Sequence, residues 1–408
     1  MEKINNLMEI KPQLDCAAGF DIHKEKIQAC YYVRDKVHEI KEYNTFTSDL
    51  LRLRDDVLKL EIKDGIMEST GVYWVALCSI LMAADIKVHV VNAKFVKNMP
   101  KEKTDKRDAQ FLCKALVNGQ IRDSYVAPES QREFRNLCRE RTKDTQHIDQ
   151  AQNRIVKILE SRNIKLRSVV KNMNTLTAKD IVRALSEGET DIEKLIKLCR
   201  GKVKKKVDLM RKALQGILTP HDRAALKRLL GDMAHYEKNI TEIEAEIKTH
   251  TDKISPQLIK ELDNITGVSK QSTEIILAEI GDKVDAWGNE DQLAAWTGTA
   301  PGNNETANKQ RPAGRRGGNR YLRTALVQMA WAAIRTKNSY WKAIFAYYSR
   351  RMPVKKAIMI IARKLVRIIY KVIKGIRTYK DYGAEYFIKH LKERMEQKRN
   401  HNISLIVK

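Results

Sequence analysis

The fold is decided by residues 14–44, LDCAAGFDIHKEKIQACYYVRDKVHEIKEYN. Three runs rich in Val, Ile, Tyr and Cys lie in this stretch, at 14–22, 26–33 and 36–44, and only a few residues separate them. Such runs favour β-strands, and connections this short join antiparallel neighbours. The stretch therefore predicts a three-stranded antiparallel meander.

Helical and strand-like segments alternate after the meander. Residues 47–61 and 71–84 have helical spacing, and each precedes a strand-like run, at 64–69 and 86–92. Strands that alternate with helices are typical of parallel pairing. We therefore expect an α/β layer fold in which parallel strands extend the meander.

The chain becomes almost wholly helical from about residue 129 to 260. Within 226–247 the apolar positions alternate in steps of three and four, at Leu226, Leu229, Met233, Tyr236, Ile240, Ile243 and Ile247. This heptad pattern predicts a coiled-coil dimer. An amphipathic helix packed on the core of its own chain is the other interpretation.

A further unit begins near residue 258. Gly267 separates two amphipathic stretches, which predicts a tight helical hairpin. The helix after such a turn offers backbone amides to a phosphate. A hairpin that serves only as a packing corner fits the same residues. From residue 319 onward the sequence is helical and strongly basic.

The composition limits the classes of function. The 408 residues carry a net charge of +26, which predicts a polyanionic partner, either nucleic acid or an anionic membrane surface. The N-terminal residues carry charges where a signal peptide has its apolar core, and no apolar run has the length of a spanning helix. The six cysteines are scattered, which favours free buried thiols. We expect a soluble cytoplasmic protein that binds nucleic acid and no membrane.

Much of the positive charge is concentrated in one region. Glu305 is the last carboxylate before Asp381, and the 75 residues between them contain 20 Lys and Arg. This run predicts contact with phosphate groups. Its segment 346–380 is basic and amphipathic, so it is expected to hold RNA or DNA. Composition alone also permits a helix on a membrane surface there.

Four carboxylates stand out against this charge. Asp21 lies late in the first predicted strand, and Glu68 lies at the end of the fourth. Asp105 and Asp108 are three residues apart in the first turn of a predicted helix, so they share one helical face. Each acid has an ordinary structural interpretation, as a turn cap, a helix-dipole partner or an ion pair.

Together the four acids suggest a metal site. Ligand sites gather at strand ends in α/β sheets. Oxygen ligands hold Mg²⁺ ions about 4 Å apart in two-metal sites, where the ions stabilise the attacking and leaving oxygens of phosphoryl transfer. A basic chain with such a site is expected to cut nucleic acid.

Several blocks of the chain closely resemble the DEDD transposases of bacterial insertion sequences, in the one-ten family, whose relatives include Piv-type site-specific invertases. The blocks are GFDIHKEKIQACYYV (19–33), MESTGVYW (67–74), VVNAKFVKNMPKEKTDKRDAQFLCKAL (90–116), REFRNLCRERTK (132–143), ITGVSKQSTEIILAEIGD (265–282), LAAWTGTAPGNNETANK (293–309) and GRRGGNRYLRTALVQMAWAA (314–333).

The resemblance implies four parts. These are an α/β RuvC-like catalytic domain of ribonuclease H type at 1–125, a helical coiled-coil region for oligomerisation at 126–257, a mainly helical transposase domain at 258–345 and a basic helical extension at 346–408. It implies a Mg²⁺-dependent DNA recombinase that acts on the bacterial nucleoid, with about two ions in each composite site. In this family a structured bridge RNA pairs with target and donor DNA. Protomers form dimers and then a tetramer, and each active site is built from two chains.

The resemblance assigns roles to particular residues. The DEDD acids fall on Asp21, Glu68, Asp105 and Asp108. The family nucleophile is a serine in a P-x-x-x-E-S-x-x-K-like block, which reads PGNNETANK here, so the aligned residue is Thr306. Its hydroxyl would form a covalent phosphoryl-enzyme.

Threonine in place of serine leaves three interpretations. Threonine keeps the alcohol, and its β-methyl group restricts χ1 and crowds an in-line attack. Thr306 is an active nucleophile, or the enzyme is impaired, or another hydroxyl such as that of Ser269, Ser272 or Ser339 has the role. The four acids favour the first.

Basic and aromatic side chains surround this block. Five cations are expected to contact phosphate or stabilise charge in the transition state: Lys309, Arg315, Arg316, Arg320 and Arg323. A general nucleic-acid-binding face is the other interpretation for each of them. Five aromatic residues are expected in the core rather than stacked on bases: Trp287, Trp296, Trp331, Tyr340 and Trp341.

The sequence thus predicts an RNA-guided DNA recombinase of an insertion element. Two other functions fit parts of the pattern. A RuvC-like nuclease would hydrolyse branched DNA with water as the nucleophile and form no covalent intermediate. An inactive relative would bind nucleic acid without cutting it.

Overall fold

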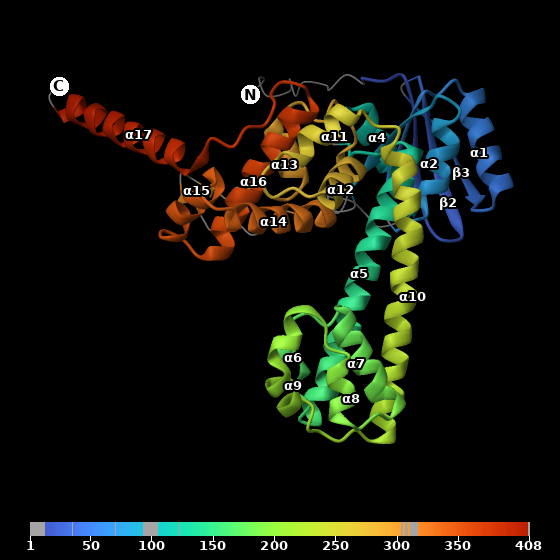
Figure 1. Cartoon of the computed structure of the whole chain (residues 1–408). Coiled ribbons are helices and arrows are strands. Elements are labelled where there is room, and N and C mark those ends of the chain that lie inside the picture. Colours follow the sequence, from blue (N-terminus) through green and yellow to red (C-terminus); the bar gives the residue numbers. More distant parts are fainter. Residues whose placement is uncertain are drawn as a thin grey trace. The chain divides into compact units, whose positions relative to one another are not determined.

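The computed structural model describes residues 13–34, 36–69, 71–92, 105–121, 123–302, 305–306, 309–310 and 317–406, without the side chains of 105–106, 305–306, 309–310, 394–395 and 397–406. The chain divides into two compact units, Met1–Glu129 and Ser130–Lys408, and each is considered by itself (Figure 1). The four-part division drawn from the resemblance stays a prediction.

The first unit is built on a mixed five-stranded sheet in the order β3-β2-β1-β4-β5. The β1–β2 and β2–β3 pairs are antiparallel, and the β1–β4 and β4–β5 pairs are parallel. The predicted meander extended by parallel strands is therefore confirmed. The strands are β1 (Cys16–Ile22), β2 (Lys26–Val33), β3 (Lys36–Asn44), β4 (Asp64–Glu68) and β5 (Lys87–Val91).

Helices cover both faces of the sheet. Because side chains alternate along a strand, Phe20 and Met67 pack with helices α1 (Thr47–Lys59) and α2 (Trp74–Met82), whose buried residues complete that cluster. Ala17 and Ile66 face the other way and pack with helix α4 (Asp105–Val117). The unit is thus an α/β/α arrangement with α4 alone packed on the second face among the described helices.

Helix α4 approaches the sheet closely because β1 has a glycine beneath it. A Cβ atom on Gly19 would lie 2.4 Å from the carbonyl oxygen of Ala109 and 2.7 Å from the backbone nitrogen of Cys113. Both atoms belong to the backbone of α4, so no side-chain rotation relieves the overlap. Gly19 therefore sets the distance between helix and sheet.

Replacing Gly19 by alanine is expected to push α4 away from the sheet and to lower the thermal unfolding midpoint. Overpacking of this kind typically lowers the free energy of unfolding by about 1–3 kcal/mol. Gly231→Ala is the matched control, because a Cβ atom added there would meet no described atom of another segment within 4 Å. It lies in a helix, where alanine is the better residue by roughly 0.5–1 kcal/mol. Circular dichroism melting of both variants checks this prediction; equal midpoints would contradict it.

The second unit begins with two long helices, α5 (Glu129–Ser161) and α10 (Pro220–Thr251), which lie antiparallel (Figure 1). Three contacts, the last of them made by Arg162 directly after α5, fix this direction. The ring of Phe134 stacks on His250 with centroids 5.3 Å apart, His147 meets Tyr236 at 4.8 Å, and Arg162 Nε donates to Asp222 Oδ2 at 2.7 Å. As the residue number rises along α5, the residue number of the contact partner on α10 falls, so the two helices run in opposite directions.

The start of α10 is fixed by a capping box. Thr219 Oγ1 accepts from Asp222 N, and Thr219 N donates to the Asp222 carboxylate. Hydrogen bonds from Thr219, with Arg162 beside them, hold the pKa of Asp222 at about 2. The carboxylate is therefore charged at neutral pH and joins the ends of both long helices.

Most of the heptad positions of α10 are buried within the single chain. Leu226, Leu229 and Met233 belong to a core cluster formed with α5 and the helices between, and Ile243 and Ile247 are buried as well. The chain's own core therefore accounts for the burial of these five side chains. The coiled-coil dimer stays a prediction.

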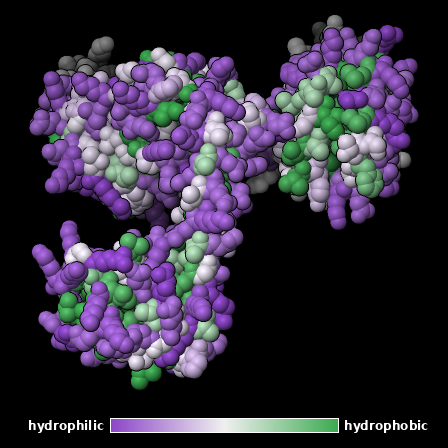
Figure 2. Space-filling view, turned by 45° about the vertical axis from the view of Figure 1, so that its right-hand side comes forward, coloured by the Kyte–Doolittle hydropathy of each residue, from purple (hydrophilic) through white to green (hydrophobic). Residues whose placement is uncertain are grey.

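Short helices between α5 and α10 complete that small bundle. They are α6 (Leu166–Val169), α7 (Leu176–Glu187), α8 (Ile192–Lys197), the 3₁₀ helix η1 (Gly201–Lys206) and α9 (Val207–Ala213). Hydrophilic residues predominate on the surface that Figure 2 presents, in keeping with the charge of the chain.

The remaining helices form another core around α14 and α16. The elements are α11 (Pro256–Asp263), α12 (Lys270–Ile280), α13 (Glu290–Trp296), the short strands β6 (Glu305–Thr306) and β7 (Lys309–Gln310), α14 (Arg320–Arg335), α15 (Tyr340–Ser349), α16 (Val354–Ile373) and α17 (Gly383–Ile406). Trp287 and Trp341 are buried as predicted, whereas Trp331 is 36% exposed.

In the part of the chain that the structure describes, no helix is long and apolar enough to cross a membrane.

The apolar face of α16 is covered by the protein itself. Ile361, Leu365 and Ile369 are fully buried, and α16 packs on α14 and α13. On its other side Arg363 and Arg367 pair with Asp291 and Glu290 of α13. A hydrogen bond from Lys371 holds the pKa of Glu290 below its usual range. The apolar face of α16 is therefore a packing surface inside the protein and not one that lies on a membrane. All six cysteines lie in described segments and none of them forms a disulfide, as the sequence predicts.

Candidate active site

Two of the predicted acids lie at the ends of adjacent parallel strands, Asp21 one residue before the end of β1 and Glu68 at the end of β4. In the β1–β4 ladder Phe20 is opposite Met67, so Asp21 and Glu68 are the next residues along their strands. Both are half-buried. Alternation places them on the same face as Gly19 and Ile66, which is the face covered by α4.

The direction of α4 brings the other acids to the same edge. Val117 O accepts from Gln13 N, Cys113 Sγ lies 3.5 Å from Ala17 O, and Ala109 lies against Gly19. As the helix is followed back toward its start, its partners therefore move forward along β1. The first turn of α4, with the half-buried Asp108 and the backbone of Asp105, lies over the end of β1 that carries Asp21.

A histidine that sequence reasoning missed joins this edge. His23 Nε2 lies 3.1 Å from Asp21 Oδ2. It follows Asp21 by two residues in the motif DIH, which was the available signal. Among the residues whose side chains are described, no three His, Cys, Asp or Glu residues form a group that could hold a metal ion, and Asp105 lies outside that set.

Thr306 lies in a small β-hairpin. Strands β6 and β7 pair antiparallel, with Glu305 opposite Gln310 and Thr306 opposite Lys309. The side chains of these residues are outside the described part, so the structure gives their backbone positions only. Arg315 and Arg316 are also outside the described residues.

The loop that carries this hairpin is closed at its base. Asn319 N donates to Trp296 O at 3.0 Å. A Cβ atom on Gly318 would lie 2.5 Å from the backbone nitrogen of Gly298 and 2.7 Å from Trp296 O. The two ends of the loop are therefore in direct backbone contact, and the segment between them is anchored on α13 and α14.

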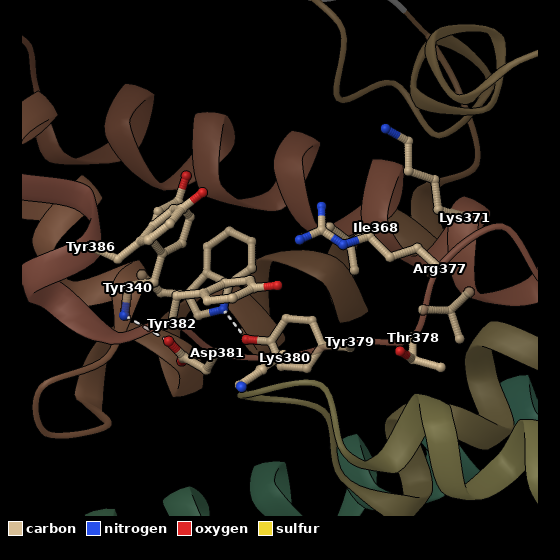
Figure 3. Close-up of a pocket in the computed structure, with 12 residues that line it drawn as sticks. Tyr340, Ile368, Lys371, Arg377, Thr378, Tyr379, Lys380, Asp381, Tyr382 and Tyr386 are labelled. Carbon is tan, nitrogen blue, oxygen red and sulfur yellow. Dashed lines mark hydrogen bonds between the residues drawn. The ribbon is translucent and has the colours of Figure 1, made fainter. Parts of the chain in front are cut away.

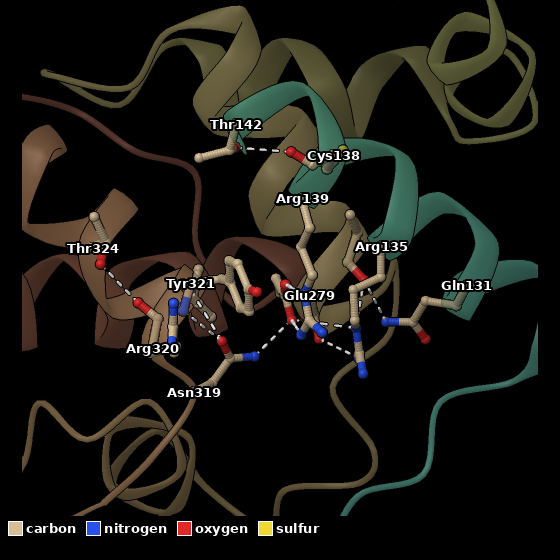
Figure 4. A network of polar contacts seen from close by, with 12 residues as sticks. Gln131, Arg135, Cys138, Arg139, Thr142, Glu279, Asn319, Arg320, Tyr321 and Thr324 are labelled. Carbon is tan, nitrogen blue, oxygen red and sulfur yellow. Dashed lines mark hydrogen bonds and ion pairs between the residues drawn. The ribbon is translucent and has the colours of Figure 1, made fainter. Parts of the chain in front are cut away.

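A buried carboxylate fixes this base, as Figure 4 shows. The side chain of Glu279, at the end of α12, is 2% exposed. Arg139 Nε donates to it at 2.7 Å and Arg139 Nη2 at 2.9 Å, Arg135 lies 3.2 Å away, and Asn319 Nδ2 donates to it at 2.6 Å. Asn319 in turn caps α14, because its Oδ1 accepts from the backbone of Tyr321 and Leu322. Sequence reasoning did not find this network, because its members come from three distant segments.

Two of the predicted cations begin helix α14. Arg320 is exposed, and its guanidinium lies 5.3 Å from the centre of the Tyr321 ring. Arg323 is half-buried one turn further on. Their positions next to the base of the Thr306 loop place positive charge near that loop.

The turn at Gly267 packs against α14. Gly267 has a φ of +90°, and a Cβ atom there would lie 2.5 Å from Met329 O and 2.7 Å from the Cβ of Ala333. The glycine is thus required both by the turn and by the close contact with α14. These contacts favour the packing-corner interpretation of the hairpin.

Two protein-family models match parts of the chain. Residues 18–164 match the family model for the DEDD transposases of IS110, described as a transposase. Residues 259–346 match a second model, described as the transposase IS116/IS110/IS902 family. Together the matches cover more than half of the chain. The chain belongs to the IS110 family of DEDD transposases. A search of curated proteins gave no match.

The two matches of this IS110-family transposase divide the candidate residues between them. The first includes Asp21, Glu68, Asp105 and Asp108, and the second includes Thr306 and helix α14. Residues 165–258 and those after 346 lie beyond both matches. The membership identifies the protein as a DNA transposase.

Proposed function

We propose that this transposase cuts and rejoins DNA strands with Mg²⁺ held by Asp21, Glu68, Asp105 and Asp108, and with Thr306 as the covalent nucleophile. The observation that carries the proposal is the convergence of the first unit's acids. Asp21 and Glu68 lie at the ends of neighbouring parallel strands, and the first turn of α4 lies over the same edge. Acids that are far apart in sequence thus belong to elements that reach the same edge of one face of the sheet.

The fold supports a RuvC-like domain of ribonuclease H type. Its sheet order, an antiparallel meander followed by two parallel strands, is the arrangement expected for that type. The acids occupy the carboxyl end of the sheet, which is where ligand sites gather in α/β folds.

The donor set fits magnesium. Four carboxylates supply the hard oxygen ligands that Mg²⁺ prefers, and neither Cys nor Met is required. Bound Mg²⁺ supplies the positive charge that stabilises the attacking and leaving oxygens of phosphoryl transfer. In the proposal Asp105 completes the set, and the His23–Asp21 contact orients one ligand carboxylate.

The covalent step is a transesterification. The Thr306 Oγ atom bonds to the phosphorus and releases its proton to water, while the bond from phosphorus to the DNA 3′-oxygen breaks and that oxygen takes up a proton. The product is a phosphothreonine ester and a free 3′-hydroxyl. Reversal with another 3′-hydroxyl rejoins strands without an external energy source. Lys309, directly opposite Thr306 in the hairpin, is the proposed cation for the developing charge.

Guidance by a bridge RNA and assembly through dimers to a tetramer belong to the same proposal. They rest on the resemblance to the family and on the basic charge of the chain, +26, which suits RNA and DNA together. In this arrangement each site takes its acids from one chain and its hydroxyl from another.

The test is a suicide substrate that traps the covalent intermediate. DNA with a nick near the cleavage point loses its short 3′-hydroxyl fragment, so the adduct persists. Peptide mapping by mass spectrometry should find the phosphate on Thr306 in wild-type protein and no adduct with Thr306→Ala. A phosphate on Ser269, Ser272 or Ser339 would overturn the assignment.

Restoring the family residue should accelerate the reaction. Thr306→Ser removes the β-methyl group that crowds in-line attack, so adduct formation is expected to be roughly 10- to 100-fold faster, the range that a misplaced nucleophile costs. Single-turnover kinetics with the same suicide substrate measures this rate. A slower serine variant would mean that the site is built around the threonine.

Hydrolysis is the second candidate, favoured by the threonine where the family has serine. A RuvC-like nuclease would use the same acids and water, and it would cut branched DNA equally well with Thr306→Ala. Cleavage without a detectable adduct would select that function over ours.

A further inference from the structure

A small pocket opens where the segment between α16 and α17 passes over α15 (Figure 3). Its volume is about 170 Å³. That is below the roughly 300 Å³ at which pockets for drug-sized molecules begin, so it suits a single ring system. Much of the lining comes from residues 368–386, which lie beyond both family matches.

One side of the pocket is an exposed stack of aromatic rings. Tyr382 and Tyr386 are 46% and 40% exposed, and their rings stack with centroids 4.8 Å apart. The His390 ring lies 4.0 Å from that of Tyr386. Tyr386 and His390 are four residues apart and share one face at the start of α17, and Tyr382, directly before the helix, stacks on Tyr386. Aromatic side chains of a core are buried, and these are not.

Two cations flank the outermost ring. The Arg377 guanidinium lies 5.9 Å from the centre of the Tyr382 ring, and Lys380 Nζ lies 5.8 Å from it. Both side chains are exposed. The third cation of the lining, Lys371, is held by Glu290 at 3.1 Å. Arg377 and Lys380 are therefore the cations best placed for a ligand.

The floor of the pocket is held in place by a chain of hydrogen bonds. Trp341 Nε1 donates to Tyr379 OH at 2.9 Å, which donates to Thr266 Oγ1 at 3.0 Å, which donates to Asp381 Oδ2 at 2.9 Å. The other oxygen of Asp381 accepts from the backbone of Tyr340 and Gly383. Both oxygens of this carboxylate are thus occupied by the protein, and the site is formed before any ligand binds.

We propose that this pocket binds one unpaired nucleobase of a single-stranded nucleic acid. The base stacks on the exposed Tyr382–Tyr386 pair, and a neighbouring phosphate contacts Arg377 and Lys380. Aromatic platforms beside cations hold single strands in this way without reading sequence. The inference rests on the proposed function for the presence of nucleic acid and adds a contact site outside the matched regions.

Fluorescence of 2-aminopurine tests the proposal, because stacking quenches it. Single-stranded DNA and RNA oligonucleotides, each with one 2-aminopurine, are titrated with full-length protein. Wild type and Tyr382→Phe should quench the probe alike, since phenylalanine keeps the stacking ring. The double variant Tyr382→Ala/Tyr386→Ala should abolish quenching and weaken binding roughly 5- to 150-fold, the range for loss of one stacked base.

The cations have their own comparison. Arg377→Gln/Lys380→Gln should weaken binding and reduce its dependence on salt. Arg167→Gln/Lys171→Gln removes two exposed charges elsewhere in the unit and should retain the quenching. Stronger quenching with RNA would assign the base to the RNA, and stronger quenching with DNA would assign it to a DNA strand.

Two results would overturn the inference. One is equal affinity and quenching in wild type and Tyr382→Ala/Tyr386→Ala. The other is wild-type protein that binds neither oligonucleotide. The adduct at Thr306 is scored separately on the suicide substrate, so failure of the pocket with an intact adduct leaves the proposed function standing. Quenching without any adduct would instead refute the covalent mechanism alone.

Discussion

Asp21→Asn is expected to lower the rate of Mg²⁺-dependent strand cleavage by about 10³-fold, the loss typical when a group that stabilises transition-state charge is removed. Asparagine keeps the size of the side chain and removes its charge. Asp21 lies at the centre of the proposed set, next to Glu68 across the ladder and under the first turn of α4. Single-turnover cleavage of labelled DNA at several Mg²⁺ concentrations measures the rate.

The control for this variant is Asp55→Asn. Asp55 lies on α1 with half of its side chain exposed, paired with its neighbour Arg54, and its loss should leave cleavage unchanged. Affinity for DNA should stay the same or rise in Asp21→Asn, since a negative charge is removed from a basic protein. Normal cleavage by Asp21→Asn would remove this acid from the metal site.

Glu279→Ala is expected to lower the free energy of unfolding by about 3–5 kcal/mol, the cost of leaving buried charges without their partner. The substitution leaves the guanidinium groups of Arg139 and Arg135 without their carboxylate partner. It also removes the hydrogen bond that holds Asn319 at the start of α14. The base of the Thr306 loop should loosen, so adduct formation should slow as well. Urea titration followed by tryptophan fluorescence reports mainly on this unit, which holds Trp287, Trp296, Trp331 and Trp341.

A matched acid separates burial from charge. Glu237 pairs with Lys179 at 2.5 Å, but its side chain is 37% exposed. Glu237→Ala should therefore cost less than about 1 kcal/mol. If both variants unfold at the same urea concentration, Glu279 is not the anchor described above.

The sheet could be predicted because its information is local. Each strand from β1 to β5 is a short run with buried apolar residues, and the tight links of the meander leave little choice of partner. The positions of Asp21 and Glu68 at strand ends follow from the same runs. Their shared face follows from the register, which no single run contains.

Other features depend on distant contacts. The close approach of α4 to β1 depends on the absence of a side chain at Gly19, and the sequence does not show which backbone atoms lie against that glycine. The heptad pattern of α10 predicts burial, but the same pattern serves a partner helix in the chain and one in another molecule. Trp331 has core spacing and is partly exposed because little packs over it. The pocket at Tyr382 is formed by three helices and the segments that link them, so no single sequence motif indicates it.

The ion pairs between α16 and α13 reduce the positive charge that the carboxylate-free residues between Glu305 and Asp381 can offer to phosphate groups. The 20 cations among those residues include Arg363, Arg367 and Lys371, and Glu290 and Asp291 of α13 already neutralise these three in part. Counterion release on binding reflects only the cations that exchange their ions for phosphate. A run without carboxylates in sequence is therefore not a run without carboxylates in space, and its footprint on a nucleic acid is smaller than its composition suggests.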